Sequence, residues 1–110
     1  MPQTHKRLGQ VTPTAATNTQ IYAPAASTDA ILTSLLCSNH GGVEDTIRVF
    51  NVPAGEVSGT GNDIYYDIPV PVGDSFLSNP ATVLTSGDKM EVYSLNGTTT
   101  FTFSGLEITP

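Results

Sequence analysis

The sequence predicts an all-β fold, a single small antiparallel β-sandwich of jelly-roll or immunoglobulin-like type. With 110 residues, the chain has room for one domain. Thr is its commonest residue, with 16 copies, and Thr is β-branched and favoured in strands; 10 Gly and 8 Pro supply turns. Short alternating segments recur between turn residues, which indicates about seven strands, and no window has helical periodicity.

Residues 1–19 are predicted to form an extended N-terminal arm, and residues 20–110 the sandwich domain. The first segment contains two Pro and five Thr, and Leu8 and Val11 are its only bulky apolar residues. It shows no sustained periodicity, so it has little core of its own. Such an arm is either disordered or ordered on a neighbouring subunit.

Three strands are expected in the first half of the domain. Gln20–Ala23 is short and stops before Pro24. In Ala30–Asn39, Thr and Ser at alternate positions and the Gly pair that follows favour a central strand over a helix. Asp45–Asn51 follows, with Ile47 and Val49 on one face.

The next segments predict an edge of the sheet. After a glycine-rich loop at 57–62, Asp63–Val70 reads as a strand with Ile64, Tyr66 and Ile68 on one face. Pro69 cannot donate a hydrogen bond to a neighbouring strand, so this strand is expected at an edge or strand end. Two short segments, 75–77 and 82–84, precede the turn at 86–88.

The last two strands are predicted to form a hairpin. Asn96-Gly97 is typical of a two-residue type I′ turn and would join 89–95 to 98–109. Phe101 and Phe103 share one face of the final strand and are expected in the core. A bulge is expected at Ser104-Gly105.

Charge disfavours nucleic acid as a partner. The chain has four basic and ten acidic side chains and a net charge of −6. From Leu8 onward there are two basic and ten acidic side chains, a formal charge of −8, which repels phosphate backbones. The basic residues Lys6 and Arg7, with His5, could contact an acidic neighbour or form a solvated basic terminus. No apolar run is long enough to span a bilayer and no secretory signal is evident, so we expect a soluble protein made in a cytosol.

The side chains able to carry chemistry do not form a catalytic or metal-binding pattern. Cys37 and His40 have the spacing of a ligand pair, but zinc needs a second pair that the sequence lacks. Asp63 and Asp67 would lie about 13 Å apart along one strand, too far for paired acid–base chemistry. These and the adjacent Glu44-Asp45 are interpreted as solvated acids. We predict no enzyme, no cofactor and no metal.

Three Tyr residues leave a binding alternative open. Tyr65, Tyr66 and Tyr93 could present an aromatic face to a sugar, although Tyr on alternating strands more often packs in the core with its hydroxyl at the rim. A structure that buries all three would remove this alternative.

The chain resembles a family of small virion proteins of tailed bacteriophages. The segments that carry the resemblance are, in order, Lys6–Gln10, Ile21-Tyr22, Leu35–Asn39 (LLCSN), Asp63–Pro69 (DIYYDIP), Leu84–Tyr93 (LTSGDKMEVY) and Phe103–Thr109 (FSGLEIT). None of these motifs is catalytic, and together they cover nearly the whole chain. The resemblance implies a structural role in the particle and leaves capsid or tail open.

We therefore expect a capsid decoration (cement) protein on the outer surface of the virion. Its partners would be the major capsid protein and neighbouring copies of itself, in an arrangement such as a trimer, without nucleic acid, membrane or small-molecule substrate. Many small bound copies can staple a shell by multivalent contact. The expected partner-binding residues are His5, Lys6, Arg7, Leu8 and Val11. The alternatives are a tail, baseplate or head–tail accessory protein and a carbohydrate-binding adhesion module.

Overall fold

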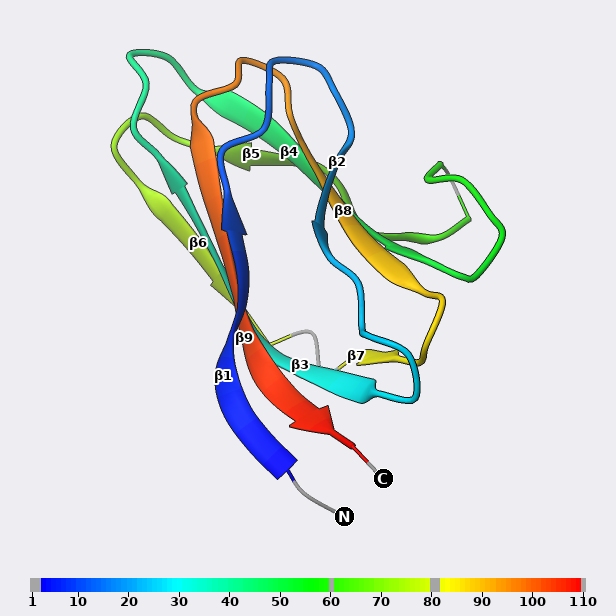
Figure 1. Cartoon of the computed structure of the whole chain (residues 1–110). Coiled ribbons are helices and arrows are strands. Elements are labelled where there is room, and N and C mark those ends of the chain that lie inside the picture. Colours follow the sequence, from blue (N-terminus) through cyan, green and yellow to red (C-terminus); the bar gives the residue numbers. More distant parts are fainter. Residues whose placement is uncertain (1–2, 60, 80–81, 110) are drawn as a thin grey trace.

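The computed structural model describes residues 3–59, 61–79 and 82–109, and every regular element in these ranges is a β-strand (Figure 1). The strands are β1 (Gln3–Val11), β2 (Thr19–Tyr22), β3 (Asp29–Asn39), β4 (Asp45–Val52), β5 (Asp63–Val70), β6 (Ser75–Ser78), β7 (Thr82–Leu84), β8 (Lys89–Ser94) and β9 (Thr99–Ile108). The predicted all-β class is confirmed. No helix able to cross a membrane occurs in the ranges described.

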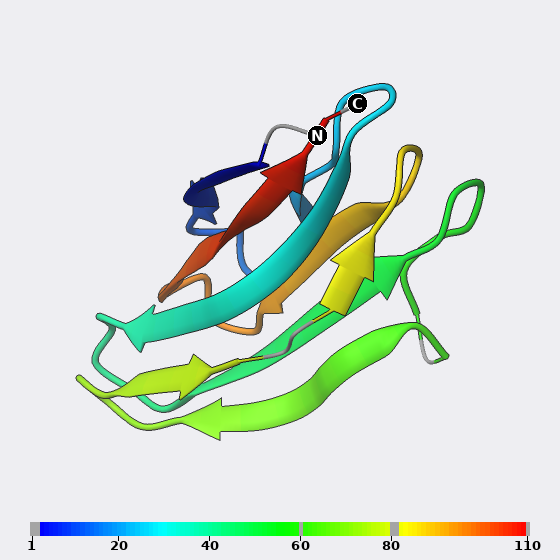
Figure 2. The same cartoon turned by 90° about the horizontal axis from the view of Figure 1, so that it is seen from below.

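The strands form two antiparallel sheets that face each other as a sandwich (Figures 1 and 2). Sheet A has the order β1-β9-β3-β6, and β7 pairs with β3 beside β6. Sheet B has the order β2-β8-β4-β5. If β6 and β7 are counted as one interrupted strand, this alternation of eight strands between two sheets is the jelly-roll order. The sequence left jelly-roll and immunoglobulin-like orders open, and the pairing selects the first.

The core lies between the two sheets and is made by alternate residues of the central strands. Phe101 and Phe103 are fully buried, as the sequence predicts. The other members of the central cluster are aliphatic or sulfur-containing: Leu32, Leu35, Cys37, Ile47, Val49, Val70, Leu84, Met90 and Val92. Burial of these side chains is the main force that holds the sheets together.

The bulge expected in the last strand occurs in its neighbours instead. The register of β1 shifts between Arg7 and Gly9, and that of β3 shifts between Leu32 and Ser34, while β9 runs through without an extra residue. Gly105 explains part of this arrangement, because a Cβ atom there would lie 2.2 Å from the carbonyl oxygen of Ile31. The glycine thus allows close strand approach rather than a bulge in β9.

The Asn96-Gly97 turn joins the two sheets, so the predicted hairpin is wrong. β8 pairs with β2 and β4, whereas β9 pairs with β1 and β3. Only Gly97 has a positive φ, of 71°, and a type I′ turn needs two such residues. The local turn signal is real, but it does not specify that the strands on either side are partners.

The carboxylate of Asp45 stabilises the crossing, the turn by which the chain passes from sheet B to sheet A at Asn96-Gly97. It accepts hydrogen bonds from the hydroxyls of Ser94 and Thr99 and from the backbone N–H groups of Asn96 (2.9 Å) and Thr46 (2.9 Å). Asp45 is fully buried, so its interpretation as a solvated acid is wrong. Burial alone would raise the pKa of Asp45, but the four hydrogen bonds outweigh burial and lower it.

The predicted N-terminal arm is a strand of the sandwich for much of its length. Gln3–Val11 form β1, which pairs with β9 along sheet A. Leu8 and Val11 pack against the core, and two apolar residues in a Thr-rich segment were too few to reveal this from the sequence. The extended conformation is as expected, but the boundary at residue 19 does not separate an arm from a domain.

Candidate functional site

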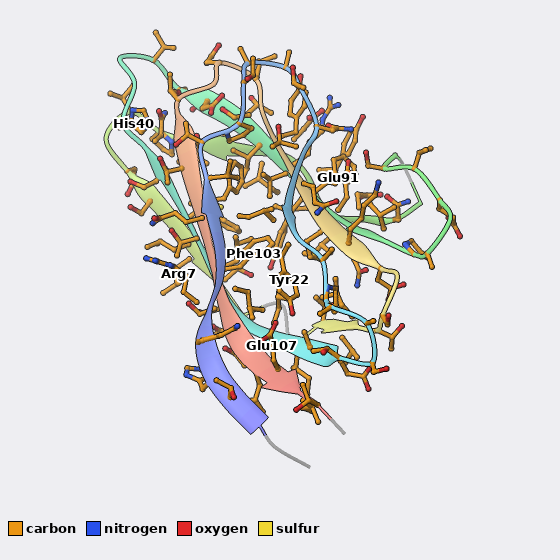
Figure 3. The ribbon with its side chains drawn as sticks, viewed as in Figure 1. Arg7, Tyr22, His40, Glu91, Phe103 and Glu107 are labelled. Carbon is orange, nitrogen blue, oxygen red and sulfur yellow. The ribbon has the colours of Figure 1, made fainter. Side chains whose placement is uncertain are left out.

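The expected partner-binding residues all lie on β1, which is an open edge of sheet A. His5 and Arg7 are exposed and lie opposite Leu106 and Ser104 of β9. Arg7 points away from the sandwich (Figure 3). Leu8 and Val11 point into the sandwich instead, so they support the strand and do not offer a surface to a partner. We call this unpaired strand edge, with its outward-facing side chains, the β1 edge.

Lys6 is exposed but is held by a polar cluster within the chain. Its Nζ lies 2.8 Å from Oε1 of Glu107, and the Tyr22 hydroxyl donates to Oε2 of the same carboxylate at 2.5 Å. Tyr22 and Glu107 face each other between the sheets (Figure 3). The bond with Lys6, and after it the bond from Tyr22, lowers the pKa of Glu107. Burial, and after it the bond to Glu107, raises the pKa of Tyr22. The cluster ties β1 and β9 to β2.

Arg7 differs from every other Lys or Arg in the chain. Lys6 pairs with Glu107, Arg48 with Asp67 and Lys89 with Glu91. Within the described ranges, Arg7 has no carboxylate within 4.0 Å. An exposed cation without a partner, on an open strand edge of an acidic protein, is available to an acidic neighbour.

A second cluster lies on the outer face of sheet B and was not predicted as a unit. Arg48 of β4 lies between the rings of Tyr66 and Tyr93, with its guanidinium carbon 4.3 Å and 4.5 Å from the two ring centroids. Its Nε donates to Oδ1 of Asp67 at 2.6 Å. We call Arg48, Tyr66, Asp67 and Tyr93 the tyrosine–arginine platform. A shallow hollow of about 320 Å³ lies over it, lined by Thr46, Arg48, Asp67, Tyr93 and Leu95.

A β-bulge assembles this platform. Ile47 pairs with Ile68 and Val49 with Tyr65, so the single residue Arg48 lies opposite both Tyr66 and Asp67. Strict alternation would send these two neighbours to opposite faces, but the bulge places both against Arg48. The predicted shared face of Ile64, Tyr66 and Ile68 is therefore wrong, because Ile64 and Ile68 pack on the core.

The bulge is conformationally costly. Asp67 has a φ of 56°, a left-handed conformation that costs a non-glycine residue about 1–3 kcal/mol. Strained residues of this kind cluster at active sites and ligand-binding sites. The hydrogen bond to Asp67 raises the pKa of Arg48 above its ordinary value, so the guanidinium stays charged.

Tyr65 does not join the other two Tyr residues. It points towards sheet A, where its ring meets Phe76 edge-on at 5.3 Å and its hydroxyl bonds to Ser78. Tyr66 is exposed and Tyr93 half-buried on the outer face. The aromatic surface considered from the sequence thus consists of two Tyr residues with an Arg between them.

Cys37 and His40 do not come together as ligands. Cys37 is fully buried in β3, whereas His40 is exposed after the strand. In the part of the chain that the structure describes, no group of three or more His, Cys, Asp or Glu side chains could hold a metal ion.

Cys37 should be inert in the folded protein. Burial raises the pKa of its thiol to about 12, so little reactive thiolate forms at neutral pH. We expect a thiol reagent to label Cys37 only after denaturant is added. Rapid labelling of the native protein in buffer alone would show that β3 opens readily or is not buried.

The comparisons with known proteins do not assign the chain to a family. No protein-family model, no curated protein and no solved structure matches the chain. The exposed features that could carry a function are the β1 edge and the tyrosine–arginine platform.

Proposed function

We propose that the chain is a capsid decoration protein of a tailed bacteriophage, which attaches to the major capsid protein through the β1 edge. The resemblance of its segments to small phage virion proteins supports this role. Jelly-roll sandwiches also build many viral capsid proteins, although the fold is shared with lectins and enzymes and assigns no function alone.

The observation that carries the proposal is the unpaired Arg7 on β1. An open strand edge can accept an extended segment of another protein, with backbone hydrogen bonds for affinity and side chains for specificity. Arg7 would select a segment with a carboxylate opposite it, because a charge-assisted pair there has no competitor within the described part of this chain. The acidic remainder of the chain would suit the outside of the shell better than contact with packaged DNA.

The outer face of sheet A extends the proposed contact. Leu36 lies opposite Leu77, and Ile31 lies opposite both Val83 and Leu106. Leu77 and Val83 are 67% and 56% exposed. This apolar row belongs to the same sheet as β1, and the same capsid subunit would cover both, with the carboxylate on the β1 side.

Charge removal at Arg7 tests the attachment. We expect Arg7→Gln to weaken binding to purified shells that lack this protein by about tenfold or more, because a charge-assisted hydrogen bond is lost. Co-sedimentation at physiological salt measures the affinity. Ser86→Glu is the control, since it changes the net charge by the same −1 at an exposed turn between β7 and β8.

The variant and its control should both unfold at the wild-type midpoint, because both sites are exposed and neither has an ion-pair partner among the described residues. Attachment through the β1 edge would be refuted if Arg7→Gln bound shells as tightly as wild type. Failure of the wild-type chain itself to bind shells would refute the decoration role.

A further inference from the structure

The tyrosine–arginine platform has no part in the proposed attachment. It lies on the outer face of sheet B, whereas β1 and the apolar row belong to sheet A. An inference from it therefore stands or falls independently of the decoration role. It combines an open hollow, two Tyr rings beside a guanidinium, a charged pair and a strained backbone.

The groups left open on the platform are both donors and acceptors. The guanidinium carbon of Arg48 lies over the rings of Tyr66 and Tyr93, and its Nε is bound to Asp67. Among the described residues, neither the two terminal nitrogens of Arg48 nor Oδ2 of Asp67 forms a hydrogen bond within the chain. The edge of the guanidinium therefore offers fixed N–H donors beside a free carboxylate oxygen.

This combination matches adjacent hydroxyl groups of a sugar ring. Each hydroxyl can accept from an Arg48 N–H and donate to the Asp67 carboxylate. The apolar C–H face of a pyranose can pack on the Tyr93 ring and on Leu95, which is 47% exposed beside the hollow. Thr46 lies two residues before Arg48 on β4, and Leu95, just after the end of β8, donates its N–H to the Thr46 carbonyl.

Charge decides between neutral and acidic ligands. An anionic group at the hollow would meet the Asp67 carboxylate and a protein of net charge −6. Arg48 already has its counter-charge at 2.6 Å, so no unbalanced positive charge attracts an anion. We propose that the platform binds a hexopyranose residue of a neutral glycan, with Arg48 and Asp67 holding adjacent hydroxyls and Tyr93 packing on the ring.

Substitution of Asp67 separates binding from folding. Asp67→Gly removes the carboxylate, and glycine adopts the positive φ of this position without strain, which offsets the loss of an exposed ion pair. The variant should unfold at or above the wild-type midpoint. Ser27→Gly is the matched control, because Ser27 has a φ of 60° and is not part of the platform.

The test begins with the full chain on an array of neutral and acidic glycans. The strongest neutral glycan is then titrated into isotope-labelled protein and followed by NMR. We expect wild type and Ser27→Gly to bind alike, with shifts at Tyr66, Tyr93 and Arg48, and Asp67→Gly to bind about tenfold or more weakly.

Four outcomes would overturn the proposal. The first three are the absence of any neutral glycan that binds above background, a clear preference for acidic glycans, and equal affinity of Asp67→Gly and wild type. Shifts confined to residues outside the platform would assign the glycan to another surface and also count against it.

Discussion

Replacing Asp45 by Ala should lower the free energy of unfolding by about 3–5 kcal/mol. The substitution removes the acceptor of four hydrogen bonds, two from the fully buried hydroxyls of Ser94 and Thr99 and two from partly buried backbone N–H groups. Each buried donor left unpaired costs about 1–3 kcal/mol. Urea unfolding at pH 7 measures the change, and Glu44→Ala, the exposed neighbouring acid, is the matched control and should change stability by less than about 0.5 kcal/mol.

The same carboxylate should make stability depend on pH. Folding lowers the pKa of Asp45 below its unfolded value of about 3.9, so the stability it contributes is complete above that value. This contribution is lost as the pH falls through the pKa of the folded state. Wild type should therefore lose more stability between pH 7 and pH 3 than Asp45→Asn. Identical pH profiles would show that Asp45 is not held as a buried carboxylate.

Truncating Phe103 to Ala should cost about 3–5 kcal/mol. The ring is fully buried at the centre of β9, between the partner strands β1 and β3 and facing sheet B. Its removal leaves a cavity that the two sheets, held by hydrogen bonds, cannot close completely. Leu77→Ala is the control, since that side chain is apolar but 67% exposed, and it should change stability little. Thermal and urea unfolding of both variants give the comparison.

A Phe103→Ala protein that unfolds at the wild-type midpoint would contradict the register of β9. In that case the outward row of this strand, which includes Thr102 and Ser104, would have to face the core. The side chains of Phe101 and Phe103 would then be exposed to solvent in the folded state.

The strands were predictable because alternation is a local property. Ala30–Asn39 and Asp63–Val70 were expected and are β3 and β5, with β5 at an edge of its sheet as Pro69 indicates. Pairing between strands is not local, and that is where the Asn96-Gly97 prediction failed. The turn chemistry at Gly97 was recognised, but the donors that fix the crossing are satisfied by Asp45, 51 residues away from Asn96.

The two candidate sites differ in how much the sequence revealed. The sequence identifies the basic residues of β1, but only the structure shows that Lys6 is paired and that Arg7 has no carboxylate partner among the described residues. The platform was hidden because strict alternation places Tyr66 and Asp67 on opposite faces. The bulge breaks this alternation, but the residue with the positive φ is Asp67 and not a glycine. The sequence therefore contains no glycine that would mark the bulge.

The two proposals fit one arrangement on a particle. Attachment through β1 and the outer face of sheet A would leave the outer face of sheet B, with Arg48 and its two Tyr neighbours, directed away from the shell. Many copies would then present the platform together, and weak glycan contacts would gain strength from multivalency. Arg7 and Asp67 variants probe the two faces separately.

The most direct test of the decoration role is the copy number of the chain in purified virions, measured by quantitative mass spectrometry against the major capsid protein. A decoration protein follows the symmetry of the shell, so we predict a ratio of about one, or of about one third to two thirds. A ratio of about one hundredth would place the chain in the tail or neck and contradict the proposed function. Absence from the particle would contradict any virion role.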